Sequence, residues 1–243
     1  MPLIIPDYLF TFHIAASALV LMCVLALIWA GVARMPVQKK KERNTTAGIL
    51  SAVLLGWFVV ALYLGSKNLY WAGNNPGVPT IQYGIFIPII IGLLALLRSA
   101  RFIRLIDALP LSWLVGVQFY RALGFMFLVL WWDGHLPWQF ALSAGVGDIA
   151  TGLLALVVAY MALRNMRGTH RAAYGWCLFG IADLVIAVTM GTLTSPGLTH
   201  FVAQDNPNML ITAYPLVMIP TFAVPVSIIL HGLCLWKLRR ARG

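Results

Sequence analysis

The sequence has few charged residues, and this scarcity excludes most soluble folds. Asp, Glu, Lys and Arg make up only 10% of the 243 residues, whereas 61% are hydrophobic. Soluble domains usually carry about 25% charged residues. A globular fold of this length could not hide so much apolar surface from water, whereas a lipid bilayer accepts it. The composition therefore predicts an integral membrane protein.

Cysteine is also scarce, and its spacing indicates no metal or redox site. Cys23, Cys177 and Cys234 all fall in apolar runs and form no CxxC pair, so we interpret them as small packing residues. The chain lacks the GxSxG, P-loop, GxGxxG and HExxH patterns of hydrolases, nucleotide-binding proteins and zinc proteases. We therefore expect no metal, no cofactor and no catalytic residue of these classes.

Seven apolar segments are long enough to cross a bilayer, because a span needs about 20 residues at a rise of 1.5 Å each. They predict an all-α fold with one seven-helix transmembrane domain over residues 1–243. The predicted spans are Phe10–Val32, Ala47–Ser66, Ile81–Leu97, Leu111–Trp132, Trp138–Leu163, Ala173–Thr194 and Met209–Leu238.

The basic residues predict the direction of these spans. Fifteen of the 17 Lys and Arg residues fall in connections on one side, and Lys67 is the sole one on the other side. Cytoplasmic loops are enriched in Lys and Arg, so we expect the N-terminus outside, in the periplasm, and the C-terminus in the cytoplasm. The net charge of +10 is then a topology signal. We expect membrane lipids, and no nucleic acid, as partners.

The chain also shows signs of an internal repeat. A shift of 131 residues places Asn75-Pro76 on Asn206-Pro207 and Tyr83 on Tyr214. This alignment predicts two parallel three-span units, residues 5–98 and 136–229, joined by a linker helix over 111–132. Chance similarity between apolar helices explains the same matches, so both interpretations stay open.

Three charged residues fall in the middle of predicted spans, where each costs about 2.5–3.5 kcal/mol on insertion scales. Arg121, Asp148 and Asp183 each lie about 15–17 Å from a membrane face at 1.5 Å per residue. Gln118 lies one turn from Arg121 on the same face. Glycines around both aspartates allow close helix approach. We predict an ion-paired cluster that binds a solute or a proton; a salt bridge that only fixes helix packing is the structural alternative.

The last span carries three prolines, which remove backbone donors and can kink a helix. Interrupted helices often line the substrate sites of transporters. We expect Tyr83 and Tyr214 to face the outer half of a cavity beside this span. The three prolines are Pro215, Pro220 and Pro225.

These features favour a small-solute or proton-coupled transporter. One alternative is a seven-helix receptor, sensor or assembly subunit without transport, which predicts a sealed core. Another is an intramembrane aspartyl hydrolase, because Gly145-Val146-Gly147-Asp148 matches the GxGD pattern of such proteases and Asp183 could be the second carboxylate. A neighbouring Arg121 argues against the hydrolase, since an aspartyl dyad must share a proton.

The middle of the chain carries a further set of short patterns. These are Gln118-x-x-Arg121, Leu136-Pro137-x-x-Phe140 and Ala144-Gly145-x-Gly147-Asp148. In this region the sequence resembles a group of uncharacterised bacterial inner-membrane proteins. The resemblance implies a bacterial inner membrane and brings no activity with it.

Overall fold

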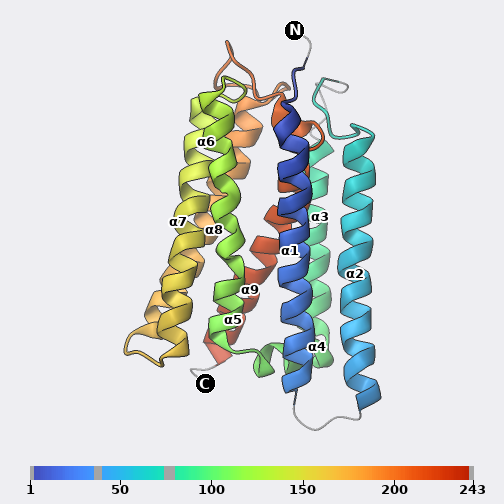
Figure 1. The fold of residues 1–243 in the computed structure, drawn as a ribbon, viewed down its shortest axis with the longest axis vertical. Helices are drawn as coiled ribbons and strands as arrows, with labels where there is room; N and C mark the ends of the chain where they lie inside the picture. Colours follow the sequence, from blue (N-terminus) through green and yellow to red (C-terminus); the bar gives the residue numbers. More distant parts are fainter. Residues whose placement is uncertain (1–2, 36–39, 74–79, 241–243) are drawn as a thin grey trace.

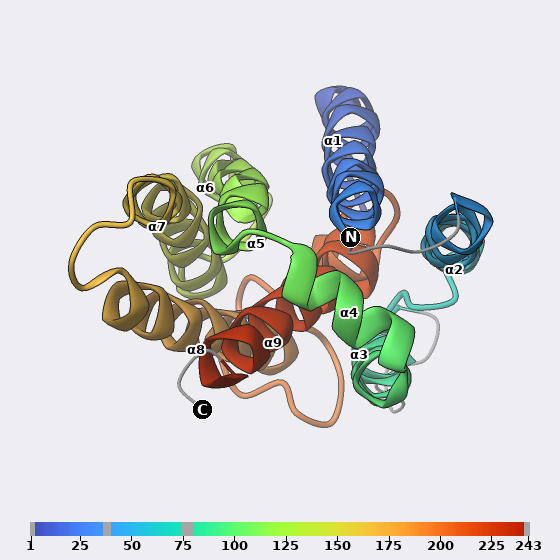
Figure 2. The ribbon, with the colours of Figure 1, turned by 90° about the horizontal axis from the view of Figure 1, so that it is seen from below.

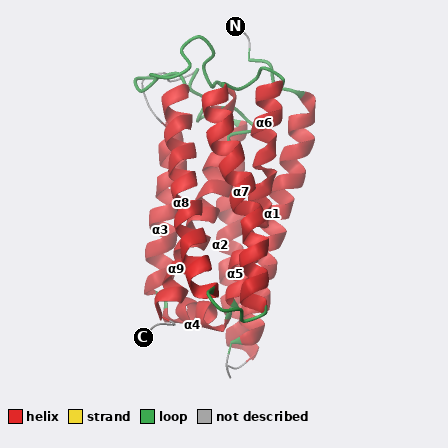
Figure 3. Cartoon of the chain, turned by 90° about the vertical axis from the view of Figure 1, so that its left-hand side faces the viewer, coloured by secondary structure: helices red, strands yellow, loops and turns green. Residues whose placement is uncertain are grey.

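The computed structural model describes residues 3–35, 40–73 and 80–240, which form an elongated bundle of helices (Figure 1). Within these residues there is no strand (Figure 3), and seven helices are long and apolar enough to cross a membrane. The predicted all-α seven-helix fold is therefore confirmed. The spans are α1 (Asp7–Arg34), α2 (Lys40–Ser66), α3 (Thr80–Arg98), the fourth span Leu111–Trp132, α7 (Trp138–Leu163), α8 (Thr169–Thr194) and the seventh span Ile219–Arg240.

The fourth and fifth spans have the predicted bounds, because prolines fix where they begin. Pro110 and Pro137 are both extended and immediately precede their helices, and proline cannot continue a preceding helix. The predicted start of the seventh span at Met209 is wrong. Residues 209–218 form a short 3₁₀-helix (η2, Leu210–Thr212) and turns, and the span begins at Ile219.

Two spans depart from regular α-helix. The fourth consists of α5 (Leu111–Gly116), a 3₁₀-helix (η1, Val117–Gly124) and α6 (Phe125–Trp132). The seventh begins with a π-helix (η3, Ile219–Ala223) and continues as α9 (Val224–Arg240). Long 3₁₀ runs and π segments are uncommon, and they often mark functional sites. Pro220 lies in η3, and α3 continues through Pro88.

A short amphipathic helix, α4 (Ala100–Ala108), crosses one end of the bundle (Figure 2). It is separate from α3, because Ser99 is extended and its hydroxyl accepts a hydrogen bond from the next turn. Lys237 of α9 donates to the carbonyls of Ile106 and Asp107, which end this helix. The chain therefore has a separate helix across this end of the bundle.

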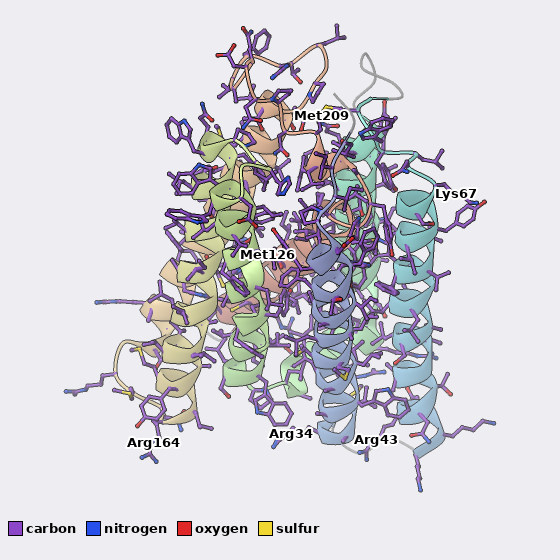
Figure 4. All side chains as sticks on the ribbon, turned by 45° about the horizontal axis from the view of Figure 1, so that its top comes forward. Arg34, Arg43, Lys67, Met126, Arg164 and Met209 are labelled. Atoms are coloured by element: carbon purple, nitrogen blue, oxygen red, sulfur yellow. The ribbon has the colours of Figure 1, made fainter. Side chains whose placement is uncertain are left out.

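The two ends of the bundle differ in charge. We call them the N-terminal end and the C-terminal end, after the chain terminus that lies at each (Figure 1). Arg34, Arg43 and Arg164 lie at the C-terminal end, opposite Lys67 and Met209 (Figure 4). The basic connections therefore gather on one side, as the alternation of the spans requires.

Burial is uneven among the spans. In the most apolar window of the seventh span 61% of residues are buried, and in that of the fourth 50%, against 6% in α3 and 17% in α2. Figure 2 shows α9 in the middle of the bundle and α2 at its edge. The two irregular spans are thus also the most enclosed, which makes them the best places for polar side chains.

The internal repeat stays a prediction. Asn75 and Pro76, which carry much of it, lie outside the described residues. Tyr83 lies in α3, whereas Tyr214 lies in the turns before η3. The proposed linker span packs closely along α7, in the second of the two predicted units.

Candidate functional site

Arg121 lies in η1, close to the middle of the fourth span. This 3₁₀-helix is eight residues long, although such runs seldom exceed about four residues. With three residues per turn, it places Gln118 directly over the same face as Arg121. Both side chains are buried, and Arg121 is only 4% exposed.

Arg121 joins two carboxylates from neighbouring helices. Its Nε and Nη2 donate to Asp148 Oδ1 of α7 at 2.8 and 2.6 Å. Nη2 also donates to Asp183 Oδ2 of α8. Nη1 donates to the Gly180 carbonyl at 3.1 Å. The predicted ion pairs between one arginine and two aspartates are therefore present.

Glycines allow the three helices to meet at this cluster. A side chain on Gly147 would overlap the Asp183 carboxylate, and one on Gly124 would meet Asp148. The sequence interpretation, that glycines bring the charges within bonding range, agrees with this geometry. The ion pairs form because α7 bears no side chain at the point where Asp183 approaches.

His231 of α9 belongs to the same cluster, and the sequence analysis missed it. Its ring is fully buried, with Nε2 at 3.3 Å from Arg121 Nη1. Because a guanidinium only donates, Nε2 accepts, and the proton of a neutral imidazole is on Nδ1. His231 lies twelve residues after Ile219, a depth of about 18 Å. If the seventh span began at Met209, as the sequence predicted, His231 would instead lie close to the inner end of the span.

Several buried polar atoms beside the cluster have no hydrogen-bond partner within the described ranges. They are both amide atoms of Gln118, the hydroxyl of Thr151 and Nδ1 of His231. All three residues are fully buried. Gln118 and Thr151 lie one turn from Arg121 and Asp148, toward the C-terminal end. Unsatisfied polar groups in proteins concentrate at functional sites or bind ordered water.

A cavity of about 200 Å³ extends from the loop over residues 195–199, at the N-terminal end, to Asp148. Its walls are mostly apolar, with Ile85, Phe127, Phe140 and Leu184 among them. Residues of α3, α6, α7, α8 and η3 contribute to the lining. The carboxylate of Asp148 thus connects the cavity with the buried arginine.

The polar residues that line the cavity near the N-terminal end are not the two tyrosines that the sequence predicted. Tyr83 is 61% exposed and Tyr214 packs against the rings of Phe10 and His13, and neither lines the cavity. Tyr83 faces outward from α3, and Tyr214 lies in the turns before η3. Other side chains therefore line the cavity where these tyrosines were expected. The predicted role of both tyrosines in the access route is therefore wrong.

Gln82 and Tyr70 provide polar groups in the cavity wall instead. Gln82 Nε2 donates to Thr192 Oγ1 at 3.1 Å, and its Oε1 has no partner in the described part of the chain. Tyr70 lies in the turns after α2, and burial raises the pKa of its hydroxyl, which therefore stays protonated. No sequence pattern pointed to either residue.

The arrangement bears on two of the alternatives. An aspartyl hydrolase needs two carboxylates that share a proton, but here Arg121 pairs with both Asp148 and Asp183. A sealed core is also not what the structure has, because the cavity reaches Asp148.

A known protein family matches the part of the chain that contains the cluster. The family described as "Domain of unknown function (DUF8737)" matches residues 78–239, two thirds of the chain. The chain belongs to the DUF8737 family. No curated protein and no solved structure matches it. The DUF8737 segment begins just before α3 and includes Arg121, Asp148, Asp183 and His231. The complete cluster therefore lies in the family domain, and α1 and α2 lie outside it.

Proposed function

We propose that this membrane protein transports a small solute, with Asp148 as the group that binds the solute or a coupling proton. The observation that carries the proposal is the position of Asp148. Asp148 lines the cavity, and its Oδ1 at the same time accepts hydrogen bonds from the buried Arg121. A purely structural ion pair has no need of a cavity that leads to it.

The charge balance of the cluster supports this role. One guanidinium faces two carboxylates, and His231 is neutral when Nε2 accepts from Arg121. With both carboxylates ionised, the cluster has a net charge of −1. An uncompensated charge inside a membrane is costly. A proton on one carboxyl group or a cation in the cavity removes it, so proton coupling or cation binding follows from the composition of the site.

The C-terminal half of the bundle is closed below the cluster. An apolar group of side chains from α5, α7, α8 and α9 fills it, including Val115, Val158, Trp176 and Leu238. Transport requires this half to open while the N-terminal half closes. The 3₁₀-helix η1 and the π-helix η3 border the cluster and the cavity, and such segments change their hydrogen bonding more readily than regular helix.

A solute-uptake screen in proteoliposomes tests the proposal. We expect accumulation of at least one small solute, and loss of it in Asp148→Asn. Asp205→Asn makes the same chemical change in an exposed loop and is expected to transport normally. Uptake that Asp148→Asn leaves unchanged contradicts the assignment of the site.

We also propose a bacterial inner membrane, with the N-terminal end in the periplasm, so that the cavity opens outward. The basic C-terminal end supports this orientation. Lys67→Cys and Arg164→Cys lie at opposite ends (Figure 4). In intact cells a membrane-impermeant thiol reagent is expected to label the first and not the second; the reverse pattern contradicts the orientation.

A receptor or sensor is the second candidate, favoured by the pairing of Arg121 with both aspartates. A ligand in the cavity would then alter these pairs without crossing the membrane. Solute binding without uptake in the same proteoliposomes distinguishes this function from transport.

A further inference from the structure

The size, the apolar walls and the charge of the cavity restrict the class of ligand that it can bind. We infer that it binds a small organic cation with an apolar body, and that the cationic group lies against Asp148. This inference rests on the proposed solute-binding role of the site. It adds the class of solute, which the ion pairs alone do not specify.

The size and the walls of the cavity define the apolar part of the ligand. A cavity of about 150 Å³ holds benzene, so about 200 Å³ suits a solute of roughly ring size with a short side arm. The side chains of Ile85, Phe127, Phe140 and Leu184 surround this space. Such walls favour an aromatic or aliphatic body over a sugar, which would leave hydroxyl groups without partners.

The charge at the inner end of the cavity defines the polar part. Among the described lining residues, Asp148 is the only one that carries a charge. Arg121 is on the buried side of this carboxylate and does not line the cavity. The nearest charge to a ligand in the cavity is therefore that of Asp148, and the cluster as a whole, with Asp148 included, carries one more negative charge than positive. Both features favour a cation and disfavour an anion.

The hydrogen bonds of Asp148 leave room for such a ligand. Arg121 uses Oδ1 for both of its bonds to this residue. No donor of the described residues bonds to Oδ2, so this oxygen can accept a hydrogen bond from a ligand. A primary or secondary ammonium group donates to a carboxylate in a charge-assisted hydrogen bond, and in doing so it neutralises the cluster. Nearer the loop over residues 195–199, Gln82 Oε1 offers a further acceptor, which has no partner among the residues that the structure describes.

Three probes of similar shape and different charge test the inference. They are 2-phenylethylammonium, the neutral 2-phenylethanol and the anionic 3-phenylpropanoate, and their binding is measured by calorimetry on the full-length protein in lipid nanodiscs. We expect the ammonium to bind at least about tenfold more tightly than the alcohol, because one charge-assisted hydrogen bond raises the affinity by about this factor. The carboxylate is expected not to bind.

Two variants and one control variant test whether the preference for the ammonium depends on this site. Asp148→Asn is expected to abolish the preference for the ammonium, whereas Asp205→Asn keeps it. Ala187→Phe fills the cavity from α8 and leaves the charged residues of the cluster in the sequence, so it is expected to abolish binding of the ammonium altogether. It therefore also covers the case in which Asp148→Asn does not fold.

Equal binding of alcohol and ammonium, or binding of none of the three, overturns the inference, as does a preference that survives in Asp148→Asn. Uptake of a different solute that depends on Asp148, without any ammonium preference, overturns the inference but leaves the proposed transport standing. If no solute is taken up but the ammonium still binds, the proposed transport is wrong and the inferred cation site stands.

Discussion

The carboxylate of Asp183 occupies the space that a side chain on Gly147 would need. The glycine is part of α7 and the aspartate is part of α8. Because Gly147 has no side chain, the two helices approach closely enough for Asp148 and Asp183 to pair with the same arginine. The cluster thus depends on backbone proximity as much as on its charges.

Replacement of Gly147 by alanine tests this relationship. The added methyl group displaces the Asp183 carboxylate, and we expect a loss of about 1–3 kcal/mol of stability, typical of overpacking in a core. The measurement is the thermal unfolding midpoint in detergent. Gly175→Ala on α8 is the control, because no atom of the described residues lies within 4 Å of the added methyl group. Equal midpoints for the two variants contradict the packing described.

Arg121→Gln leaves two buried carboxylates without their cation. Breaking a buried ion pair from one side costs about 3–5 kcal/mol, so we expect poor folding and a lowered midpoint. The triple variant Arg121→Gln, Asp148→Asn, Asp183→Asn removes all three charges and is expected to recover most of the stability but no transport. Recovery of transport along with stability indicates a role in folding alone.

Gln118→Leu separates function from stability. Both amide atoms of this fully buried side chain lack a partner in the described residues, and an unsatisfied polar group costs about 1–3 kcal/mol. Leucine of similar volume is expected to keep or raise the unfolding midpoint. If the amide of Gln118 takes part in binding the solute or the proton, solute uptake falls although the protein stays folded. Unchanged uptake assigns Gln118 to packing only.

Filling the cavity is expected to stop uptake without unfolding the protein. Ala187 lines the cavity from α8, whereas Ala182 on the same helix is exposed on the outer surface of the bundle. Ala187→Phe is expected to block uptake, and Ala182→Phe to leave it intact. Normal uptake by Ala187→Phe shows that the solute takes another route.

The sequence predicted the helices well where hydrophobicity and prolines determine them. Leu111–Trp132 and Trp138–Leu163 match because a proline precedes each. Arg121, Asp148 and Asp183 were found because charges inside apolar runs are conspicuous and depth follows from residue counts. That these three charges pair also followed from the glycines around them.

The remaining features depend on tertiary structure. The apolar character of residues 209–218 suggests that the last span begins there, yet they form a short 3₁₀-helix and turns. The true start at Ile219 puts His231 at the depth of the charged cluster, which the sequence alone did not indicate. The cavity could not be predicted, because it forms where several helices and the loops at the N-terminal end leave space between them. Gln82 and Tyr70 resemble ordinary polar residues near a membrane surface, and only their position in the wall marks them. The exposure of Tyr83 depends on the rotation of α3 about its axis, which the pattern of a largely apolar helix does not reveal.

The central claim is that Asp148 gives a negative charge to a cavity that is accessible from the N-terminal end. Val188 lines that cavity from α8, so Val188→Cys, in a protein whose three native cysteines are replaced by alanine, reports on it directly. The measurement is the rate of its reaction with small methanethiosulfonate reagents of opposite charge. We predict that the cationic reagent reacts faster than the anionic one, and that Asp148→Asn removes the difference. Absence of reaction, or equal rates with Asp148 in place, contradicts the account.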